Sequence, residues 1–423
     1  MKEPPLGDST GAEAAPDYPM HSTTPTHTGR QATSPEVSQP LSMNRASVAA
    51  GVPPAVEGGV SPPESPGSKA MSRPSFPQEL PPHLASLVWG SFLGDALAMP
   101  VHWYYDRAAL RRDYGVVRDF VAPRNPHPDS ILWRSTYIPA NHRGDILHDQ
   151  AVYWGQRGIH YHQFLRAGEN TLNLQLARPL IESLNACGRY DPDDYLRRYL
   201  DFMLTPGRHR DTYVEECHRK FFTAYARGTD PRRCGGTDIH IGGLAHVGTL
   251  VAFSGGDPAI ALDRVRQHLP LTHRSPEVLT AAEAMVRILT AVVRGAGLQE
   301  TILEFGSDWF SRRKAEAWSR EPDEVVVGQR VSPACYISEA FPASLYLAWK
   351  YADNFEAGLI ANTNLGGDNC HRGAVVGALL GAATPLERLP ARWLDGLQLA
   401  PFLRQETAGL SQGSPLNAFP PAH

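Results

Sequence analysis

The chain of 423 residues lacks several features that would assign it to a common class at once. It has five scattered cysteines and no CxxC pair, which argues against a disulfide framework and favours a reduced compartment. Its formal net charge is only −4, so neither nucleic acid nor an anionic membrane is expected as a partner. No apolar run is expected to reach the ~18 residues of a transmembrane span. These absences predict an intracellular, cytoplasmic protein.

Strand signals are also scarce. Only residues 325–327 and 249–253 form short apolar runs of the strand type, and the second run suits a helix equally well. The chain has no alternation of strands with helices and no GxGxxG after a strand, which excludes the usual dinucleotide-binding fold.

The first 82 residues are rich in Pro, Ser, Gly, Thr and Ala and poor in large apolar residues. Such a segment cannot bury enough apolar surface to offset its ordering entropy, so it is interpreted as a disordered tail. It has neither the apolar core of a signal peptide nor the acid-poor composition of a transit peptide. The prediction is one large domain over residues 83–404, followed by a flexible C-terminal tail over 405–423.

Helical periodicity covers most of this domain. Asp191 and Pro192 begin a helix that stops near residue 205, and residues 276–294 follow the i, i+3, i+4, i+7 template up to Gly295. Apolar stripes also mark residues 341–349 and 355–360, the latter capped by Asp353. We therefore expect an all-α, orthogonal multi-helix bundle, with the aromatic, loop-rich residues 113–161 as an insertion over a pocket.

The most informative segment is residues 362–381, where polar side chains precede an apolar helix with a glycine at every fourth position. Gly366 and Gly367 can form a turn closed to other residues, and Asp368 or Asn369 can cap the helix. The glycine face lets another backbone approach closely. The segment is either a functional site at a helix mouth or a capped core helix, and alone it does not discriminate.

Four other segments carry polar groups that could perform chemistry. Asp95 interrupts an apolar helix and should have a partner, as a structural acid or a site residue. His102 and Trp103 follow the end of that helix, and either could contact a ligand or simply pack. The helix start at Glu169 could hold a hard cation or be an ordinary cap. The glycine-rich residues 235–245 lack a P-loop lysine, and His273 could bind a ligand or cap a helix.

The order of these segments resembles the ADP-ribosylglycohydrolase family. GSFLGDALAMPV resembles its opening motif, GENTLNLQLA its acidic helix start, IHIGGLAHVG its glycine loop, LTHRSP its Thr-His turn, and NLGGDNCHRGAVVGALLGA its closing motif. The resemblance implies an all-α domain with two Mg2+ ions below a cleft for ADP-ribose or an ADP-ribosylated protein. The residues that it implies for substrate binding are Trp103, Ile241, Gly242, Gly243, His273, Gly366, Gly367 and Arg372.

The sequence departs from the family at the metal positions. The implied ligands are Glu169, Asn170, Thr171, Asp368, Cys370 and His371, and His102 stands where the family has an acid. An amide, a thiol and imidazoles replace several hard carboxylates, which suits a softer ion better than Mg2+. One divalent cation, a different ion, or none are all open.

Two functions follow from these residues. In the first, the chain is a hydrolase that cleaves an N- or O-glycosidic bond of an ADP-ribosyl or related ribosyl conjugate at a remodelled centre. Glu169, Asp368 and His102 are then its catalytic residues, converging with His371. In the alternative, the chain is a non-catalytic member that binds ADP-ribose or a nucleotide, or serves as a structural protein.

Overall fold

A computed structural model describes residue 81 and residues 83–410. The predicted N-terminal tail, apart from residue 81, and residues 411–423 lie outside the described residues. The folded part continues past residue 404, because residues 405–410 include the end of α17 and a short 3-10 helix. Thr407 in this stretch accepts a hydrogen bond from Trp89 Nε1 (3.3 Å).

The fold is all-α, as the sequence predicts. Residues 83–410 form 17 α-helices and only isolated β-bridges. The helices are α1 Leu84–Ala98, α2 Arg107–Tyr114, α3 Leu172–Gln175, α4 Ala177–Cys187, α5 Pro192–Leu204, α6 Glu216–Ala226, α7 Val247–Phe253, α8 Pro258–His268, α9 Pro276–Val293, α10 Leu298–Phe305, α11 Arg312–Trp318, α12 Asp323–Val325, α13 Ile337–Lys350, α14 Phe355–Asn364, α15 Asn369–Ala382, α16 Ala391–Gly396 and α17 Ala400–Glu406.

Neither candidate strand forms. Residues 249–253 lie in α7, and residues 325–327 pass from α12 into an irregular π-type turn. Val327 makes only an isolated bridge to Val331, within the same turn. The strand prediction for residues 325–327 is wrong because the apolar run finds no neighbouring strand to pair with, and Val326 and Val327 are buried in the core instead.

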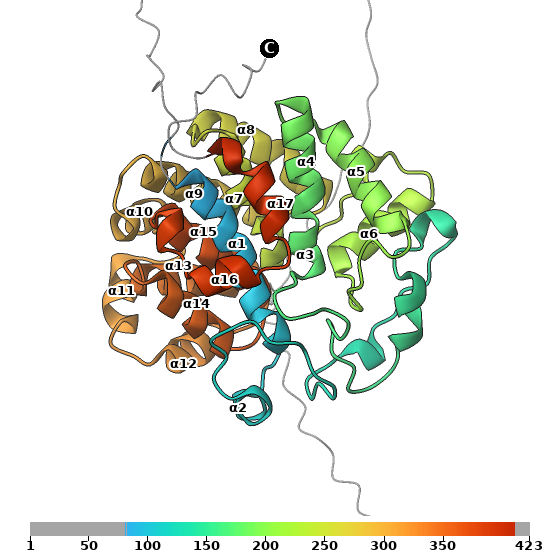
Figure 1. The fold of residues 1–423 in the computed structure, drawn as a ribbon, viewed down its shortest axis with the longest axis horizontal. Helices are drawn as coiled ribbons and strands as arrows, with labels where there is room; N and C mark the ends of the chain where they lie inside the picture. Colours follow the sequence, from blue (N-terminus) through green and yellow to red (C-terminus); the bar gives the residue numbers. More distant parts are fainter. Residues whose placement is uncertain (1–80, 82, 411–423) are drawn as a thin grey trace, which may run out of the picture. The chain divides into compact units, whose positions relative to one another are not determined.

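The centre of the fold is the contact between the first and last long helices. α1 crosses α15 in the middle of the described helices (Figure 1). Gly377 and Gly373 lie against the backbones of Gly90 and Gly94, and a Cβ atom on any of the four would collide with the opposite carbonyl. The predicted glycine face is confirmed, and it lets the two helix backbones touch.

The α1 segment corrects one expectation from the sequence. With the 3-10 helix η1 (Met99–Val101) that continues it, α1 forms an 18-residue stretch, Leu84–Val101, long and apolar enough to cross a membrane by length and composition. All of it is buried among the other helices, so it is packed as a core helix.

The helix starts predicted from the sequence are confirmed for α5 and α9 but not for α14. Asp191 caps α5 by accepting from Asp193 N and Asp194 N, and Pro276 begins α9, as predicted. The cap of α14 is Asn354, which accepts from Ala357 N, and not the predicted Asp353. The capping oxygen must reach the N3 amide, and only the residue directly before the first turn does so here.

Candidate functional site

A backbone lock joins the end of η1 to the turn before α15. Trp103 N donates to Gly367 O (2.8 Å), and Gly367 N donates to Tyr104 O (2.7 Å). Gly366 and Gly367 have φ of 65° and 64°, and a Cβ on Gly366 would collide with the Tyr104 carbonyl. Trp103 also has a positive φ, 60°, which is uncommon for a bulky residue and typical of functional sites. The lock fixes the side chains on both sides of it.

The locked side chains begin a linear series of acids and imidazoles. His102 Nε2 lies 2.9 Å from Asp368 Oδ1, and Asp368 Oδ2 lies 3.0 Å from His371 Nδ1. His371 Nε2 then lies 2.9 Å from Glu215 Oε1. His102, Asp368 and His371 are almost fully buried, whereas 17% of the Glu215 side chain is exposed. The series therefore runs from the core toward solvent.

In the opposite direction the series reaches a third acid, Asp211. His102 Nδ1 lies 2.7 Å from His162 Nε2, and His162 Nδ1 lies 2.6 Å from Asp211 Oδ1. If His102 donates from Nε2 to Asp368, its Nδ1 carries the lone pair and must accept from His162 Nε2. Two lone pairs cannot face each other at hydrogen-bond distance, so one more proton must lie between His162 Nδ1 and Asp211 Oδ1.

The charges of the series alternate. Burial acts to lower the pKa of His371, but the negative charges of Asp368 and Glu215 raise it well above its usual value. Burial acts to raise the pKa of Glu215, yet His371 outweighs it and brings that pKa down to about 2. The same balance holds the pKa of Asp368 below its usual range. Burial lowers the pKa of His102 to about 3, so His102 is neutral and His371 is an imidazolium between two carboxylates.

A cavity of about 450 Å3 opens above the exposed end of this series. Trp103 forms part of its wall and packs edge-to-face against Tyr161 (4.6 Å between centroids) and Tyr213 (5.0 Å). The loop-rich residues 113–161 contribute to this wall, as predicted. The lining residues are Trp103, Tyr105, Ile131, Arg134, Tyr161, Tyr213, Glu215, Glu216, Asp238, His240, Ala334, Cys335, Tyr336, Asp368 and His371.

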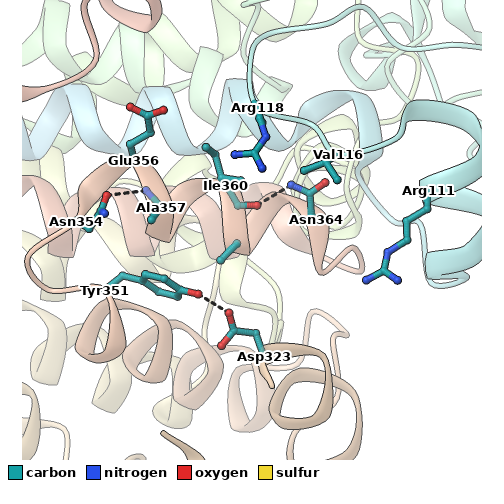
Figure 2. A pocket seen from close by; sticks show the side chains of 11 residues that line it. Arg111, Val116, Arg118, Asp323, Tyr351, Asn354, Glu356, Ala357, Ile360 and Asn364 are labelled. Carbon is teal, nitrogen blue, oxygen red and sulfur yellow. Dashed lines mark hydrogen bonds between the residues drawn. The ribbon is translucent and has the colours of Figure 1, made fainter. Parts of the chain in front are cut away.

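A larger cavity, of about 570 Å3, lies along α14 and has a different character (Figure 2). Several of its polar groups are occupied by structural bonds. Asn354 caps α14, the Tyr351 hydroxyl donates to Asp323 (2.6 Å), and Asn364 donates to the carbonyls of Val117 and Ile360. No site residue predicted from the sequence lines this cavity, so the aromatic cavity is the better candidate site.

The Asp95 carboxylate has the partners that its burial demands. Thr171 Oγ1 donates to Asp95 Oδ1 (2.6 Å), and Thr171 N and Asn170 Nδ2 donate to Oδ2 (2.9 Å each). Burial nevertheless raises the pKa of Asp95 to about 6, with these hydrogen bonds opposing it. Asn170 and Thr171 are thus turned toward α1, where they tie the start of α3 to the core.

Glu169 does not join the cluster around Asp368. Its carboxylate pairs with Arg166 and Arg210 and lines a separate cavity of about 260 Å3. The expectation that Glu169 converges with His102 and His371 is corrected by this placement. The physical reason is the turn before α3, which points the next two side chains inward and leaves Glu169 directed at the two arginines.

Most residues implied for substrate binding do not line the aromatic cavity. Trp103 does, but the lining does not include Ile241, Gly242, Gly243, His273, Gly366 or Gly367. Arg372 is fully buried, where its guanidinium donates to the Asn362 side chain (2.8 Å) and to Gly366 O (2.9 Å). Asp368 stands at the N-cap of α15 but makes no capping bond, because its oxygens face the imidazoles. Cys370 donates to Asp95 O (3.6 Å).

The structure adds residues that the sequence did not suggest. Glu215, Asp211 and His162 complete the series, and they come from loops or from a helix N-cap with no periodic pattern. The dense charges of residues 208–219 were the one sequence feature that could have indicated Asp211 and Glu215 as site residues. Glu215 holds the N-cap position of α6 without capping it, which leaves its carboxylate for His371.

The residues around Asp368 do not fit the octahedral oxygen shell of Mg2+. Asp368 is the only carboxylate among the grouped atoms of His102, Asp368 and His371, which lie within 4.8 Å of one another. Both of its oxygens already face imidazole nitrogens, and the oxygens of Asp95 already accept from Thr171 and Asn170. Imidazole and carboxylate donors suit a softer ion better than Mg2+, but His371 is already protonated between two carboxylates.

Comparison with known proteins agrees with this architecture. The chain is similar to a solved structure described as an ADP-ribosylglycohydrolase-related protein complex, with a TM-score of 0.53 and 24% identity over 78% of this chain and 96% of that one. It is also 25% identical over 341 residues to an uncharacterized protein of Archaeoglobus fulgidus, covering 75% of this chain and 92% of the relative. A sequence model of the ADP-ribosylglycohydrolase family matches residues 83–416. The chain belongs to the ADP-ribosylglycohydrolase family.

Proposed function

We propose that the chain hydrolyses the glycosidic bond of an ADP-ribosyl or related ribosyl conjugate in the aromatic cavity. The observation that carries this proposal is the group Asp368–His371–Glu215 at the cavity wall, where two carboxylates flank one imidazolium. Membership of the family supports a glycohydrolase-like reaction class. The conjugate itself and the remodelled centre are part of the proposal.

The charge of this group suits the reaction. Cleavage of a ribosyl bond passes through an oxocarbenium-like transition state, which carries positive charge on the sugar. Asp368, His371 and Glu215 together carry one net negative charge and are held in place before the reaction. Glu215 Oε1 accepts from His371, which leaves Oε2 to take a proton from the attacking water. Glu215 is the member of the group that water reaches, because Asp368 is fully buried.

The cavity wall supplies the binding surface. Trp103, Tyr161 and Tyr213 hold one another edge-to-face, so a flat base can stack on a rigid aromatic wall. Arg134 lines the same cavity and is the cation that we assign to the phosphates of the ligand. His102 stacks behind Trp103 at 4.0 Å and supports it from the side of the core.

Turnover of ADP-ribosylated arginine, ADP-ribosylated serine and small ADP-ribose conjugates, with Mg2+, Mn2+ or Zn2+ supplied, tests the proposal. We expect Glu215→Gln to lower turnover by ~10²–10⁴-fold, the usual contribution of a positioned general base. Glu169→Gln tests whether Glu169 or Glu215 is the catalytic carboxylate. The sequence-based prediction requires that this variant lose turnover, whereas the position of Glu169 beside Arg166 and Arg210 requires that it retain turnover. No turnover by the wild-type protein on any of these substrates would refute the reaction.

The alternative is a non-catalytic protein that binds ADP-ribose. The observation that favours it is that both oxygens of Asp368 are engaged by imidazoles, where the resemblance implies carboxylates free for metal ions. Calorimetry with ADP-ribose distinguishes the two functions. Binding without turnover supports a sensor, and absence of both supports a structural protein.

A further inference from the structure

We propose that Cys217, Asp238 and His273 form a Zn2+ site that is separate from the cluster around Asp368. Their Sγ, carboxylate oxygen and ring nitrogen lie within 4.8 Å of one another, and all three residues are buried. Thiolate, imidazole and carboxylate are the three ligand types of protein zinc sites. The proposal concerns metal binding alone, so it stands or falls independently of the proposed reaction.

Three separate elements bring these ligands together. Cys217 lies in the first turn of α6, Asp238 precedes the 3-10 helix η6 (Ile241–Leu244), and His273 lies in the turn before α9. A backbone hydrogen bond from Arg274 N to Gly236 O (2.9 Å) holds the turn against the loop. An ion at this point would join all three elements from the interior.

The free ring nitrogen of His273 is the observation that points to a ligand. Its Nε2 is buried and has no hydrogen-bond partner, which is a costly state for a polar atom. The nearest carboxylate oxygen, Asp238 Oδ1, is 3.7 Å away, too far for a hydrogen bond. Two ligands on one tetrahedral Zn2+ are ~3.3 Å apart, so a small shift of either side chain places both on one ion.

Neighbouring hydrogen bonds orient the side chains of His273 and Asp238. His273 Nδ1 lies 2.9 Å from Thr272 Oγ1, and donation from Nδ1 to that hydroxyl leaves Nε2 as the lone-pair nitrogen. Asp238 Oδ1 lies 2.9 Å from His240 Nδ1, which orients the carboxylate. Metal-bound histidines and carboxylates are held by outer hydrogen bonds of this type.

The donor set selects the ion. A single carboxylate with a thiol and an imidazole does not suit Mg2+ or Ca2+, which take oxygen shells, and it does suit Zn2+. Burial, Glu215 and Asp238 raise the pKa of the Cys217 thiol, so binding of the ion must displace the thiol proton. Three protein ligands leave one position for water, and Asp238 places the site at the wall of the aromatic cavity.

The first test uses the wild-type protein and needs no variant. Protein stripped with a chelator and reconstituted with Zn2+ should retain one equivalent after dialysis. X-ray absorption at the zinc edge should then show one sulfur ligand at ~2.3 Å together with nitrogen and oxygen ligands. Failure to retain zinc, or a shell of nitrogen and oxygen only, overturns the proposal.

The second test locates the sulfur with Co2+ in place of Zn2+. The wild-type protein should show a thiolate-to-cobalt charge-transfer band in the near ultraviolet. Cys217→Ser should abolish this band, and Cys370→Ser should keep it, because Cys370 lies in a different group of possible ligands, with His102 and His162. His273→Gln should weaken cobalt binding, with circular dichroism confirming the fold of each variant. A band lost in Cys370→Ser and kept in Cys217→Ser would overturn the assignment.

Discussion

Replacement of Thr171 by Val should weaken the fold in a pH-dependent way, because its hydroxyl supports the buried carboxylate of Asp95. Val keeps the shape of the side chain and removes only the 2.6 Å hydrogen bond to Asp95 Oδ1. Burial raises the pKa of Asp95 to about 6, above its ordinary 3.8. The contribution of Asp95 to stability is therefore complete below the ordinary pKa and is lost as the pH rises through about 6.

The size of the loss follows from the charge of the acceptor. At pH 8 Asp95 is ionised, and a hydrogen bond to a charged group contributes ~1.5–3 kcal/mol. At pH 5 it is largely protonated, and a neutral hydrogen bond contributes only ~0.5–1.5 kcal/mol. We expect Thr171→Val to lower the free energy of unfolding by the larger amount at pH 8 and by the smaller amount at pH 5.

Urea denaturation of both proteins at the two pH values measures this difference. Thr290→Val is the matched control, because Thr290 is also buried but donates to a neutral carbonyl, Val286 O (2.8 Å). Its loss should be the same at both pH values. An equal loss for Thr171→Val at pH 5 and pH 8 would refute the reasoning, since it would mean that Asp95 does not change its charge over this range.

Three further predictions concern packing, charge and binding. Gly377→Ala should lower the free energy of unfolding by ~1–3 kcal/mol, because its Cβ meets the α1 backbone, whereas Gly409→Ala, with open space around it, should not; thermal melting compares them. Glu215→Gln should lower the free energy of unfolding by up to ~3 kcal/mol at a pH above the ordinary pKa of 4.5, and this deficit should shrink as the pH falls toward about 2. A deficit in the free energy of unfolding that stays constant between pH 6 and pH 3 would contradict the low pKa of Glu215. Arg134→Ala should raise KM by ~10–100-fold with kcat unchanged if it binds phosphate, and a fall in kcat alone would exclude that role.

Local patterns in the sequence predict the helices well. Periodicity and capping chemistry give α5 and α9, and the spacing of small residues gives the close approach of Gly373 and Gly377 to α1. Asp95 was expected to have a partner, and the structure supplies Thr171. Each of these follows from positions a few residues apart or from the cost of burying one polar group.

The candidate site could be predicted only in part, because its bonds join distant positions. His102 and Asp368 were candidates from their places at helix ends and from the resemblance, but Glu215, His162 and Asp211 lie in segments without periodicity. Direction of a side chain is not visible from its position either. The turn that carries Glu169 directs its carboxylate at surface arginines, although its two neighbours point into the core.

The α1–α15 contact also determines when the site can form during synthesis. His102 and Asp368 are separated by 266 positions, so the acid–imidazole series cannot assemble until almost the whole domain has left the ribosome. Until then, the apolar stretch Leu84–Val101 has no α15 to cover it. Nascent chains with exposed apolar helices are prone to aggregate, so this protein should depend on chaperones during translation. A chain truncated before α15 should lose solubility and site together.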